Sequence, residues 1–392
     1  MKLLFFSSQF PTPANHHGAA FNRSMVRGLA MRHDVRVVCP IPWTTGFRRA
    51  SPSDESPERY EARFQRYYFI PRMAMQLRGV FMWWSLRHTL LDMAHTRRPD
   101  VVLSYWAHPD GEAALRFGRH IGAPVALVVG GSDVLVLTAD QRRKKRIDAV
   151  LHGVDQVIAI GEHLRQQVVA MGVPPDRVTS ILRSVDCSMF SPGDRWSARD
   201  RCGIARDHTV LLCVGRLVPV KGVEVLLEAV ARLRLLIPNL LVCIAGTGPL
   251  APRLEKIAVK SGIASMVRWL GTVRQADLPD WYRAADLTVL PSYSEGVPNV
   301  LLESVACGTP FVASRVGSIP YIADDACDRL VSPGRSDEIA AAVVDLLERR
   351  ARPENRRHAL TTEAEFQSRL DAVLERCVQP SESRADADRP LP

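Results

Sequence analysis

A strand, a polar loop and a helix are indicated most clearly by Asp286-Leu-Thr-Val-Leu-Pro-Ser-Tyr-Ser-Glu-Gly-Val-Pro-Asn-Val-Leu-Leu-Glu303. The apolar run after Asp286 is typical of a strand buried in a parallel sheet. Pro298 suits a first helical turn, and the apolar residues after it give one helical face. A helix that begins here presents free N–H groups and a positive dipole end. The pattern predicts an anion site framed by Glu295 and Glu303, suited to a phosphate with hydroxyl-rich groups on either side.

The same alternation of strands and helices extends over most of the chain. In the first half, strands are expected at 2–6, 35–39, 101–104, 125–129, 156–160 and 178–182, with helices at 19–32 and 111–121. In the second half, strands are expected at 209–214, 240–245, 267–270, 287–290 and 310–313, with helices at 222–235, 249–261, 277–284, 297–307 and 336–350. This order predicts an α/β protein with two Rossmann-like, doubly wound parallel sheets that face a central cleft.

The domain boundaries are predicted from length and composition. A chain of 392 residues is longer than one core usually supports. We expect a first domain over 1–190, a linker rich in Pro, Gly, Ser and Arg over 191–207, and a second domain over 208–350. A C-terminal helix over 351–378 could pack back on the first domain, and the polar tail 379–392 is expected to be disordered. Asp386-Ala-Asp388 in this tail imitates a metal-binding motif, but two carboxylates alone hold Mg²⁺ poorly, so no metal site is expected.

The composition is ordinary for a soluble globular protein, with 46% hydrophobic and 24% charged residues. No run of 18 uncharged apolar residues occurs, so no membrane-spanning helix is expected. The first residues, 1–6, resemble a β-strand more than a signal peptide. The eight cysteines are scattered without a CxxC pair, which favours a reducing compartment and disfavours a zinc site. A cytoplasmic location follows from these features.

The net charge of +9 lies entirely within residues 1–190. That half could face an anionic acceptor or membrane surface, or it could be a solvated surface enriched in Arg. Residues 72–87 mix Arg, Met and aromatic residues, and 142–146 are all basic. The first segment could lie on a membrane as an amphipathic helix, with the second adding electrostatic attraction. The competing interpretations are a helix packed on the first sheet and an exposed basic turn.

Positively charged residues follow the first strand of the second half. Gly215 and Arg216 come directly after that strand, and Lys221 precedes the next helix. The planar fork of Arg and the point charge of Lys both suit diphosphate oxygens.

Two glycines follow the next strand, and one apolar residue ends the strand after it. Gly246 and Gly248 could let the backbone approach a ligand. The full GxGxxG pattern is missing and no acid closes the following strand, so a nicotinamide cofactor is not expected. Leu270, within Trp269-Leu-Gly-Thr272, could line a base pocket beside the same cleft.

The spacing of Glu295 and Glu303 separates their roles. Residues eight apart in a continuous helix lie roughly 12 Å apart along its axis, so they could not share one ligand atom. With Glu295 in the loop, the two carboxylates could hold opposite ends of an extended ligand. The diphosphate would lie over the residues between them, Gly296, Val297, Pro298, Asn299 and Val300. Taken alone, each glutamate could equally be a solvent-exposed, capping or ion-pairing residue.

These motifs together resemble the retaining glycosyltransferases of family 4, which have the two-Rossmann-domain GT-B fold. The resemblance covers about residues 1–350 and is carried by Gly215-Arg216 with Lys221-Gly222, by 246–249, and by Glu295 with Glu303 followed by 306–310. It implies that Arg216 and Lys221 hold the donor diphosphate, that Glu295 contacts the transferred sugar, and that Glu303 contacts the ribose hydroxyls. The backbone around 297–300 would contact the phosphates.

The first half carries weaker family features. Gly18 matches a glycine that family members place near the donor phosphates. The segments 106–111, with His108, and 130–134, with Asp133, resemble a subgroup that makes bacterial exopolysaccharide or cell-wall polymers. Asp133 could accept a hydrogen bond from a sugar hydroxyl, and His108 could do the same or titrate. The alternatives are a helix N-cap for Asp133 and a capping or packing role for His108.

Three positions depart from the family pattern. Gly130 stands where many members have His, Arg183 stands where Asn is usual before the linker, and Tyr321 replaces an acidic residue. Arg183 could alter the hinge, or contact the acceptor if it adds positive charge to the cleft. The two glutamates are untouched by these departures.

The predicted function is a retaining glycosyltransferase of the hexosyltransferase class. It would move a sugar from a UDP- or GDP-sugar to a glycan or lipid-linked acceptor, in exopolysaccharide, capsule or cell-wall polymer synthesis. No cofactor, metal or nucleic-acid partner is expected, and the protein could associate peripherally with the cytoplasmic face of an anionic inner membrane. The alternatives are a sugar-nucleotide epimerase or phosphorylase on the same fold, and a non-catalytic sugar-nucleotide-binding subunit.

Overall fold

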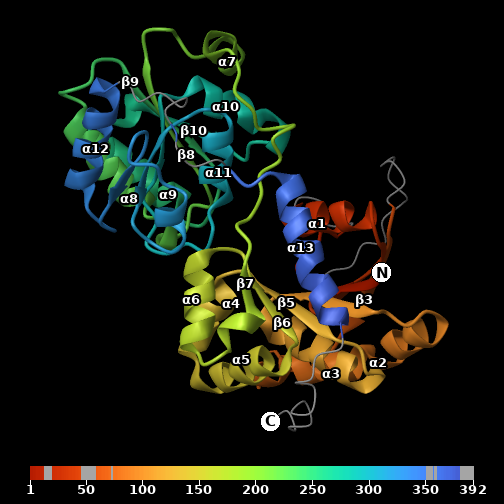
Figure 1. Cartoon of the computed structure of the whole chain (residues 1–392). Coiled ribbons are helices and arrows are strands. Elements are labelled where there is room, and N and C mark those ends of the chain that lie inside the picture. The colour runs from red at the N-terminus through yellow and green to blue at the C-terminus, as the bar shows by residue number, and fades with distance from the viewer. Residues whose placement is uncertain (13–19, 46–58, 72–73, 350–355, 357–359, 380–392) are drawn as a thin grey trace. The chain divides into compact units, whose positions relative to one another are not determined.

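The chain divides into two units in the computed structural model (Figure 1). The structure describes residues 1–12, 20–45, 59–71, 74–349, 356 and 360–379. Unit 1 consists of Met1–Leu182 together with the chain from Ala364 onward, and unit 2 consists of Arg183–Glu363. Each unit has its own parallel sheet with helices on both faces.

The sheet of unit 1 has seven parallel strands in the order β3-β2-β1-β4-β5-β6-β7. The strands are β1 (Lys2–Phe6), β2 (Asp34–Pro42), β3 (Glu61–Tyr67), β4 (Val101–Tyr105), β5 (Val125–Val129), β6 (Gln156–Ala159) and β7 (Val178–Ser180). The central strands β4 and β5 are buried along their whole length, because helices cover both faces. The direction of the strand order reverses between β1 and β4.

The helices of unit 1 connect these strands, and the last one comes from the C-terminus. They are α1 (Ala20–Ala30), α2 (Arg78–Thr96), α3 (Glu112–Ile121), α4 (Ser132–Leu135), α5 (Gln141–Gly153), α6 (Glu162–Ala170) and α13 (Glu363–Val378). Short turns precede α2 and α3, at η1 (Met75–Leu77) and η2 (Ala107–Gly111).

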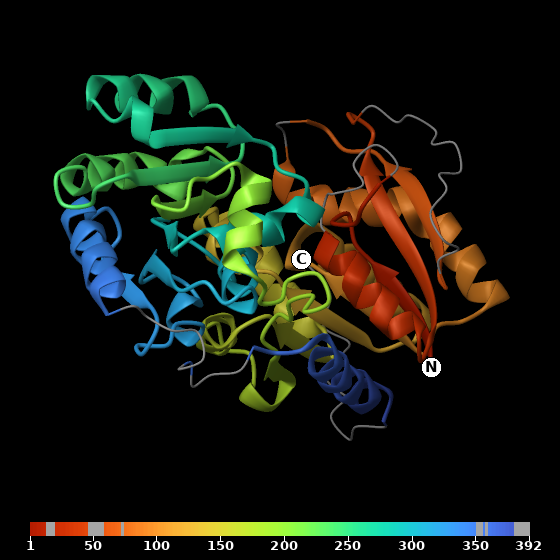
Figure 2. The same cartoon turned by 90° about the horizontal axis from the view of Figure 1, so that it is seen from above.

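The helix α13 lies beside α1 in both views (Figures 1 and 2). Its Gln367 Nε2 donates to the carbonyl of Met25 at 3.1 Å, and its Asp371 lies 3.0 Å from His33 Nε2. A Cβ on Gly28 would lie only 2.1 Å from Gln367 Nε2. A glycine at position 28 is therefore what allows the two helices to approach so closely.

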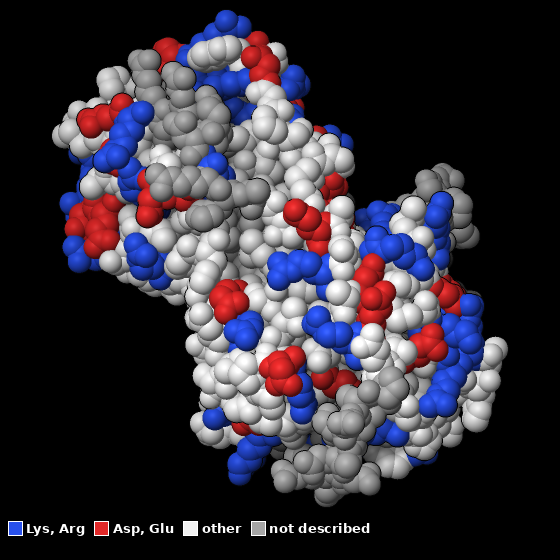
Figure 3. All heavy atoms as spheres, viewed as in Figure 1, with Lys and Arg blue, Asp and Glu red and all other residues white. Residues whose placement is uncertain are grey.

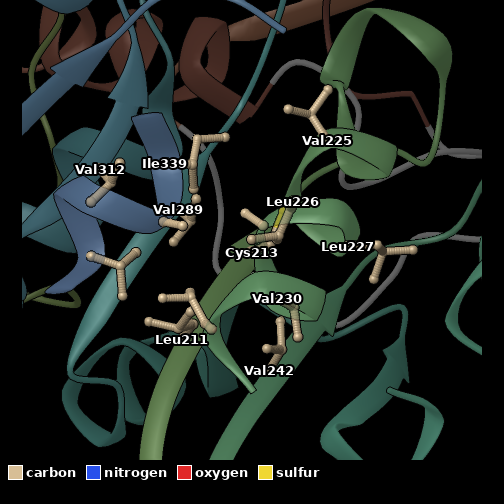
Figure 4. Close-up of a cluster of buried hydrophobic side chains, with 14 of the residues drawn as sticks. Leu211, Cys213, Val225, Leu226, Leu227, Val230, Val242, Val289, Val312 and Ile339 are labelled. Atoms are coloured by element: carbon tan, nitrogen blue, oxygen red, sulfur yellow. The ribbon is translucent and has the colours of Figure 1, made fainter. Parts of the chain in front are cut away.

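The sheet of unit 2 has six parallel strands in the order β10-β9-β8-β11-β12-β13. The strands are β8 (Thr209–Val214), β9 (Leu240–Ala245), β10 (Val267–Gly271), β11 (Leu287–Leu290), β12 (Phe311–Ser314) and β13 (Arg329–Val331). The helices are α7 (Arg195–Cys202), α8 (Val223–Leu233), α9 (Ala251–Lys260), α10 (Leu278–Ala284), α11 (Asn299–Ala306) and α12 (Ser336–Glu348). One core fills the space between α8, α12 and the central strands, and Figure 4 shows Leu211, Leu226, Val230, Val242 and Val289 within it.

The predicted linker 191–207 is not a linker in this structure. It contains α7, which packs against α10 and belongs to unit 2. Arg199 on α7 is only 1% exposed, donates to the carbonyl of Ala284 at 3.0 Å and pairs with Asp286 at 2.8 Å. Arg195 and Arg199 of the predicted linker both pair with Asp286, and the units separate earlier, between Leu182 and Arg183.

Several elements differ from the sequence predictions. The edge strands β3 and β13 and the helices α5, α6 and α7 were not predicted. The residues 142–146 lie in the first two turns of α5, not in an exposed turn. The Arg-rich 72–87 segment includes the start of α2, whose Met82, Leu86 and Leu90 are buried, so this helix packs on the unit. In the part of the chain that the structure describes, no helix is long and apolar enough to cross a membrane.

Candidate functional site

Lys221 and Glu295 meet at the point where the strand order of the unit 2 sheet reverses. Lys221 ends the short turn η5 (Pro219–Lys221) after β8, and Glu295 lies in the loop after β11, the neighbour of β8. Ligands of open α/β sheets bind in the crevice that such a reversal creates at the carboxyl ends of the strands. Lys221 Nζ lies 2.6 Å from Glu295 Oε1, and the fully buried Ser292 donates its hydroxyl to the same oxygen at 2.6 Å.

The helix α11 begins directly after this pair. Pro298 is its N-cap, with φ −77° and ψ 110°, so it lies just outside the first turn in which it was predicted. The first N–H groups of a helix have no partner within it and point outward. Arg183, the first residue of unit 2, donates from Nη1 to the side-chain oxygen of Asn299 at 2.8 Å. A guanidinium thus lies at the N-terminus of α11, within unit 2.

Glu303 lies on α11, one turn beyond its N-terminus. The hydroxyl of the fully buried Tyr282, on α10, donates to Glu303 Oε2 at 2.8 Å. Burial raises the pKa of Glu303, and the hydrogen bond from Tyr282 opposes that rise. Burial and the neighbouring Glu303 carboxylate raise the pKa of Tyr282 well above its usual value, so the phenol stays a donor. Tyr282 therefore fixes the orientation of the Glu303 carboxylate.

Arg216 lies at the same edge of the sheet, directly after β8, and its side chain is exposed. Among the residues that the structure describes, no acid pairs with its guanidinium. The carbonyl of Gly215, just before it, faces the loop after β9. A Cβ on Gly246 would lie 1.9 Å from that carbonyl oxygen, and a Cβ on Gly248 would lie 2.4 Å from the Leu217 carbonyl oxygen. These glycines allow two loops to pack together, a structural reason beyond the ligand approach that the sequence suggested.

The strand β10 adds the third neighbouring loop. Its pairing with β9 shifts register between Trp269 and Gly271, so Leu270 is an extra residue in the strand. The N–H of Gly246 donates to the Gly271 carbonyl at 2.7 Å. Leu270 thus lies beside the glycine loop, at the same edge as Lys221. Its predicted contact with a base stays a prediction.

The loop that carries Glu295 is braced by Gly317 and Ser318, a contact that the sequence did not indicate. Gly317 has φ 55°, and a Cβ on it would lie 2.0 Å from the Glu295 carbonyl oxygen. The N–H of Ser318 donates to the Gly296 carbonyl at 3.0 Å. A left-handed glycine is thus required after β12 for this close approach. Ser292 and Tyr282 were missed as well. Only the position of Ser292, two residues after the buried strand β11, could have indicated it.

The Asp133 carboxylate is held by backbone N–H groups in unit 1. Its side chain is fully buried, and it accepts backbone N–H groups from Ala107 at 3.1 Å, Gly130 at 3.1 Å and Gly131 at 2.8 Å. Burial raises its pKa to about 6, and these hydrogen bonds oppose the rise. The sequence suggested a sugar contact or a helix N-cap, but the N-cap of α4 is Gly131. The carboxylate instead holds together the loops after β4 and β5.

His108 is a packing residue in this structure. It is 3% exposed, and its Nε2 lies 3.1 Å from the Gln76 carbonyl. Burial lowers its pKa to about 4, so the imidazole is neutral near pH 7 and donates from Nε2. The predicted acceptor contact has no support from this arrangement. Gly18 lies outside the described residues, so its predicted place near the donor phosphates stays a prediction.

A cluster of arginines surrounds His108 at the carboxyl edge of the unit 1 sheet. The buried Glu112 carboxylate pairs with Arg146 at 2.8 Å and Arg116 at 3.0 Å. Arg78 and Arg143 also lie close enough to lower the pKa of His108. Within the described part of the chain, the Nε atoms of Arg78 and Arg143 are buried without a hydrogen-bond partner. Glu112 therefore shares the cluster with Asp140, which lies 4.0 Å from Arg143 Nε, and with Asp110, which lies close enough to Arg78 for their charges to interact. No group of three His, Cys, Asp or Glu side chains suited to a metal occurs among the described residues.

Family models match nearly the whole chain. The model "Glycosyl transferases group 1" matches residues 194–365, and the model "Glycosyltransferase Family 4" matches residues 19–189. The two matches correspond to the two parallel-sheet units. The chain belongs to the group 1, family 4 glycosyltransferases, and its two Rossmann-like units are those of the GT-B fold.

The most similar relatives include several D-inositol 3-phosphate glycosyltransferases. Enzyme 2 of Catenulispora acidiphila is 40% identical over 212 residues, which cover 51% of this chain and 50% of the relative. The protein of Mycobacterium tuberculosis is 31% identical over 321 residues, covering 79% and 61%. The chain thus spans between about half and about three fifths of the length of these two curated relatives. Because these names specify an inositol phosphate, the exopolysaccharide or cell-wall subgroup stays a prediction.

Solved structures share the fold at low sequence identity. Anabaena Alr3699/HepE in complex with UDP superposes with a TM-score of 0.75 at 18% identity, covering 96% of this chain and 100% of that chain. Sucrose-phosphate synthase of Thermosynechococcus elongatus superposes with a TM-score of 0.70 at 20% identity, covering 96% of both chains.

Proposed function

We propose that this protein is a retaining glycosyltransferase that takes its sugar from a UDP- or GDP-linked donor. The observation that carries the proposal is the Lys221–Glu295 pair at the strand-order reversal, directly before the N-terminus of α11. This arrangement joins a cation, a carboxylate and a helix dipole within one edge of one sheet. The family match and the UDP bound to the similar Anabaena protein support a nucleotide-sugar donor.

The leaving diphosphate is the group that most needs stabilisation. Lys221, Arg216 and the N–H groups at the start of α11 would offset the negative charge that develops on it as the sugar departs. Because these groups supply positive charge, we propose no metal or cofactor for this step. Glu303, oriented by Tyr282, would accept hydrogen bonds from the ribose hydroxyls. Arg183 would add a further cation beside Asn299.

Glu295 would position the sugar without forming a bond to it. Lys221 and Ser292 both donate to Oε1, which leaves Oε2 for a sugar hydroxyl. A carboxylate engaged in this way is a poor nucleophile, so we propose attack by the acceptor from the face that the diphosphate leaves. The acceptor oxygen forms its bond to the anomeric carbon as the bond to the phosphate oxygen breaks. That phosphate oxygen takes the proton of the acceptor hydroxyl.

The acceptor is proposed to be anionic, either as a glycan or as a lipid-linked sugar. The arginine cluster at the carboxyl edge of unit 1 supports this, because the buried Arg78 Nε has no hydrogen-bond partner among the described residues. The relatives named for D-inositol 3-phosphate support a phosphorylated acceptor as well. Exopolysaccharide, capsule or cell-wall polymer synthesis would supply such acceptors. All eight cysteines are free, which supports the reducing cytoplasm as the location.

The test combines nucleotide binding with product analysis. UDP or GDP should raise the melting temperature by mass action, and a matching nucleotide sugar should be consumed when an anionic acceptor is added. Lys221→Ala and Glu295→Ala should each lower turnover by orders of magnitude while the fold is retained. Turnover at the wild-type rate in these variants would refute the proposal. Conversion of the donor without acceptor would indicate an epimerase or phosphorylase, and binding without turnover a non-catalytic subunit.

A further inference from the structure

Four large apolar side chains lie exposed on one margin of unit 1. They are Trp43, Tyr68, Ile70 and Trp84, whose exposed fractions are 44%, 60%, 51% and 56%. We call these four residues the aromatic rim. They come from three segments, namely the ends of β2 and β3 and the second turn of α2. Exposed apolar residues that occur singly need no explanation, but a contiguous group indicates an interaction surface.

Hydrogen bonds show that the rim residues are neighbours. Trp43 Nε1 donates to the carbonyl of Phe69, between Tyr68 and Ile70, at 2.9 Å. The N–H of Tyr68 donates at 3.0 Å to Ser85 Oγ, which is next to Trp84 in α2. Pro42 and Tyr67 are paired at the ends of β2 and β3, so the rim lies at the carboxyl edge of the unit 1 sheet. His108 and the arginine cluster follow strands at that same edge.

The rim is not the face that α2 uses for packing. The packing face is Gly79, Met82, Leu86, Leu90 and Met93, all of which are buried. Trp83 packs against Phe117, with ring centroids 6.4 Å apart. The adjacent Trp84 is exposed and is not one of the buried residues of α2. The fold therefore does not require an apolar residue at position 84.

Positive charge accompanies the rim. The Arg87 guanidinium lies over the Trp84 ring, 4.1 Å from its centroid, and Arg66 is exposed on β3. The exposed acid Glu61 is paired with Arg63 at 2.7 Å, so that pair adds no net charge. In Figure 3, Lys and Arg side chains gather along the margin of unit 1 that α2 and β3 occupy in Figure 1. The whole excess charge of +9 lies within residues 1–190.

We propose that the aromatic rim docks unit 1 on an anionic lipid bilayer. Trp and Tyr side chains favour the headgroup level, where one end of the ring is apolar and the other is wet. Ile70 would reach the acyl boundary, while Arg66 and Arg87 would meet anionic headgroups. An aliphatic residue among the aromatics, with arginines beside them, fits a lipid surface better than a neutral glycan. The inference rests on the proposed function, because docking would bring a lipid-linked acceptor to the carboxyl edge of unit 1.

The test measures sedimentation of the full chain with two kinds of vesicle. Phosphatidylcholine vesicles that contain phosphatidylglycerol should bind the protein, and vesicles of phosphatidylcholine alone should bind it much less. Raising the salt concentration should weaken binding, because the arginine attraction is screened. The double variant Tyr68→Ser, Trp84→Ser should bind the anionic vesicles at least about tenfold more weakly than the wild type. Trp84→Tyr should retain binding. The tryptophan emission of the protein should shift to shorter wavelength on docking, and this shift should be smaller in the double variant, which lacks Trp84.

Trp196 provides the matched control. It is an exposed tryptophan, at 42%, with the Arg199 guanidinium 5.4 Å from its ring centroid, but it lies on α7 in unit 2. Trp196→Ser should bind vesicles like the wild type. Equal vesicle binding by the double variant and the wild type would overturn the proposal. It would also be overturned if a soluble oligosaccharide, but not vesicles, shifted the tryptophan fluorescence of the protein. The shift in melting temperature caused by UDP, measured on each variant, shows that unit 2 is folded and tests the donor site separately.

Discussion

At the scale of single residues, the Glu295 carboxylate is held by two donors on one oxygen. Lys221 Nζ and Ser292 Oγ both lie 2.6 Å from Oε1. Lys221 supplies charge to this oxygen. The buried Ser292 fixes its direction, because Glu295 is the one hydrogen-bond partner of the Ser292 hydroxyl within the described part of the chain. A carboxylate held in this way keeps its other oxygen in one place. The sugar of a bound donor would therefore meet a pre-organised acceptor of hydrogen bonds.

Ser292→Ala tests this positioning role. Loss of a hydrogen bond to a charged group costs about 1.5–3 kcal/mol, so kcat should fall about tenfold to a hundredfold. The KM for the donor should change much less, because the proposed contact of Lys221 with the diphosphate would be retained. The matched control is Ser294→Ala, since Ser294 is exposed in the same loop. A Ser292→Ala enzyme with the kcat of the wild type would show that Lys221 alone orients Glu295.

Tyr282→Phe tests the assignment of Glu303 to the ribose. The change removes the donor to Oε2, and with it the interaction that lowers the pKa of Glu303 against burial. The pKa of Glu303 should rise further, so UDP affinity should weaken as the pH falls and begin to do so at higher pH than in the wild type. Calorimetric titration at several pH values measures this. Inorganic pyrophosphate has no ribose, so an equal loss of its affinity would contradict the assignment.

The buried His108 should make the stability of unit 1 sensitive to acid, because burial lowers the pKa of its imidazole. Its folded pKa of about 4 lies below the ordinary 6.5, so the neutral ring stabilises the fold fully above pH 6.5. This contribution is lost as the pH falls through about 4 and amounts to about 3 kcal/mol at most. Burial raises the pKa values of Asp110 and Asp133 to about 6. These two carboxyl groups therefore favour the folded state as the pH falls over the same range, opposite to His108. The gap in melting temperature between wild type and His108→Gln should therefore narrow from pH 7 to pH 4, and a constant gap would contradict this.

At the scale of elements, the loops after β8 and β9 form one packed unit. Gly248→Ala would place a Cβ 2.4 Å from the Leu217 carbonyl oxygen, and backbone atoms cannot move aside cheaply. We expect this variant to lose about 1–3 kcal/mol of stability and at least tenfold in affinity for UDP. Gly203→Asn is the control, because Gly203 has φ 62° at the end of α7 with no atom within 4 Å, and Asn tolerates that conformation. Unchanged UDP affinity in Gly248→Ala would show that the loop pair is not needed for binding.

How far the sequence predicted each element depended on how local its signal was. The predicted ranges of β1, β5, β8, β9 and β11 agree with the structure, because each is a short apolar run between polar residues. The edge strand β3 reads Glu-Ala-Arg-Phe-Gln-Arg-Tyr and is mostly exposed, so it carries no such signal. The closeness of Lys221 and Glu295 could be predicted, because both follow neighbouring parallel strands. The bonds of Tyr282 and Asp133 could not, because their partners come from other elements and only tertiary packing brings them together.

At the scale of the whole molecule, the chain crosses between the units twice. It leaves unit 1 at Leu182 and returns at Ala364, so unit 1 is built from both ends of the sequence. The returning helix α13 buries Phe366, Leu370, Val373 and Leu374 against the unit. Its Asp371 also pairs with Arg32 at 2.5 Å and with His33. Stability of the first unit therefore depends on residues that follow the second.

Truncation tests this dependence most directly. A chain that ends at residue 362 lacks α13, and loss of about 1.5–3 kcal/mol for each of its four buried apolar side chains would be comparable to the whole stability of an ordinary domain. Calorimetry should show that the transition of unit 1 is lost or moved far down in temperature. Unit 2 contains Lys221, Glu295 and α11, so the midpoint temperature of its transition should still rise on addition of UDP. A chain that ends at residue 379 keeps α13 and should melt like the full protein. If the shorter chain melts like the longer one, α13 does not stabilise unit 1.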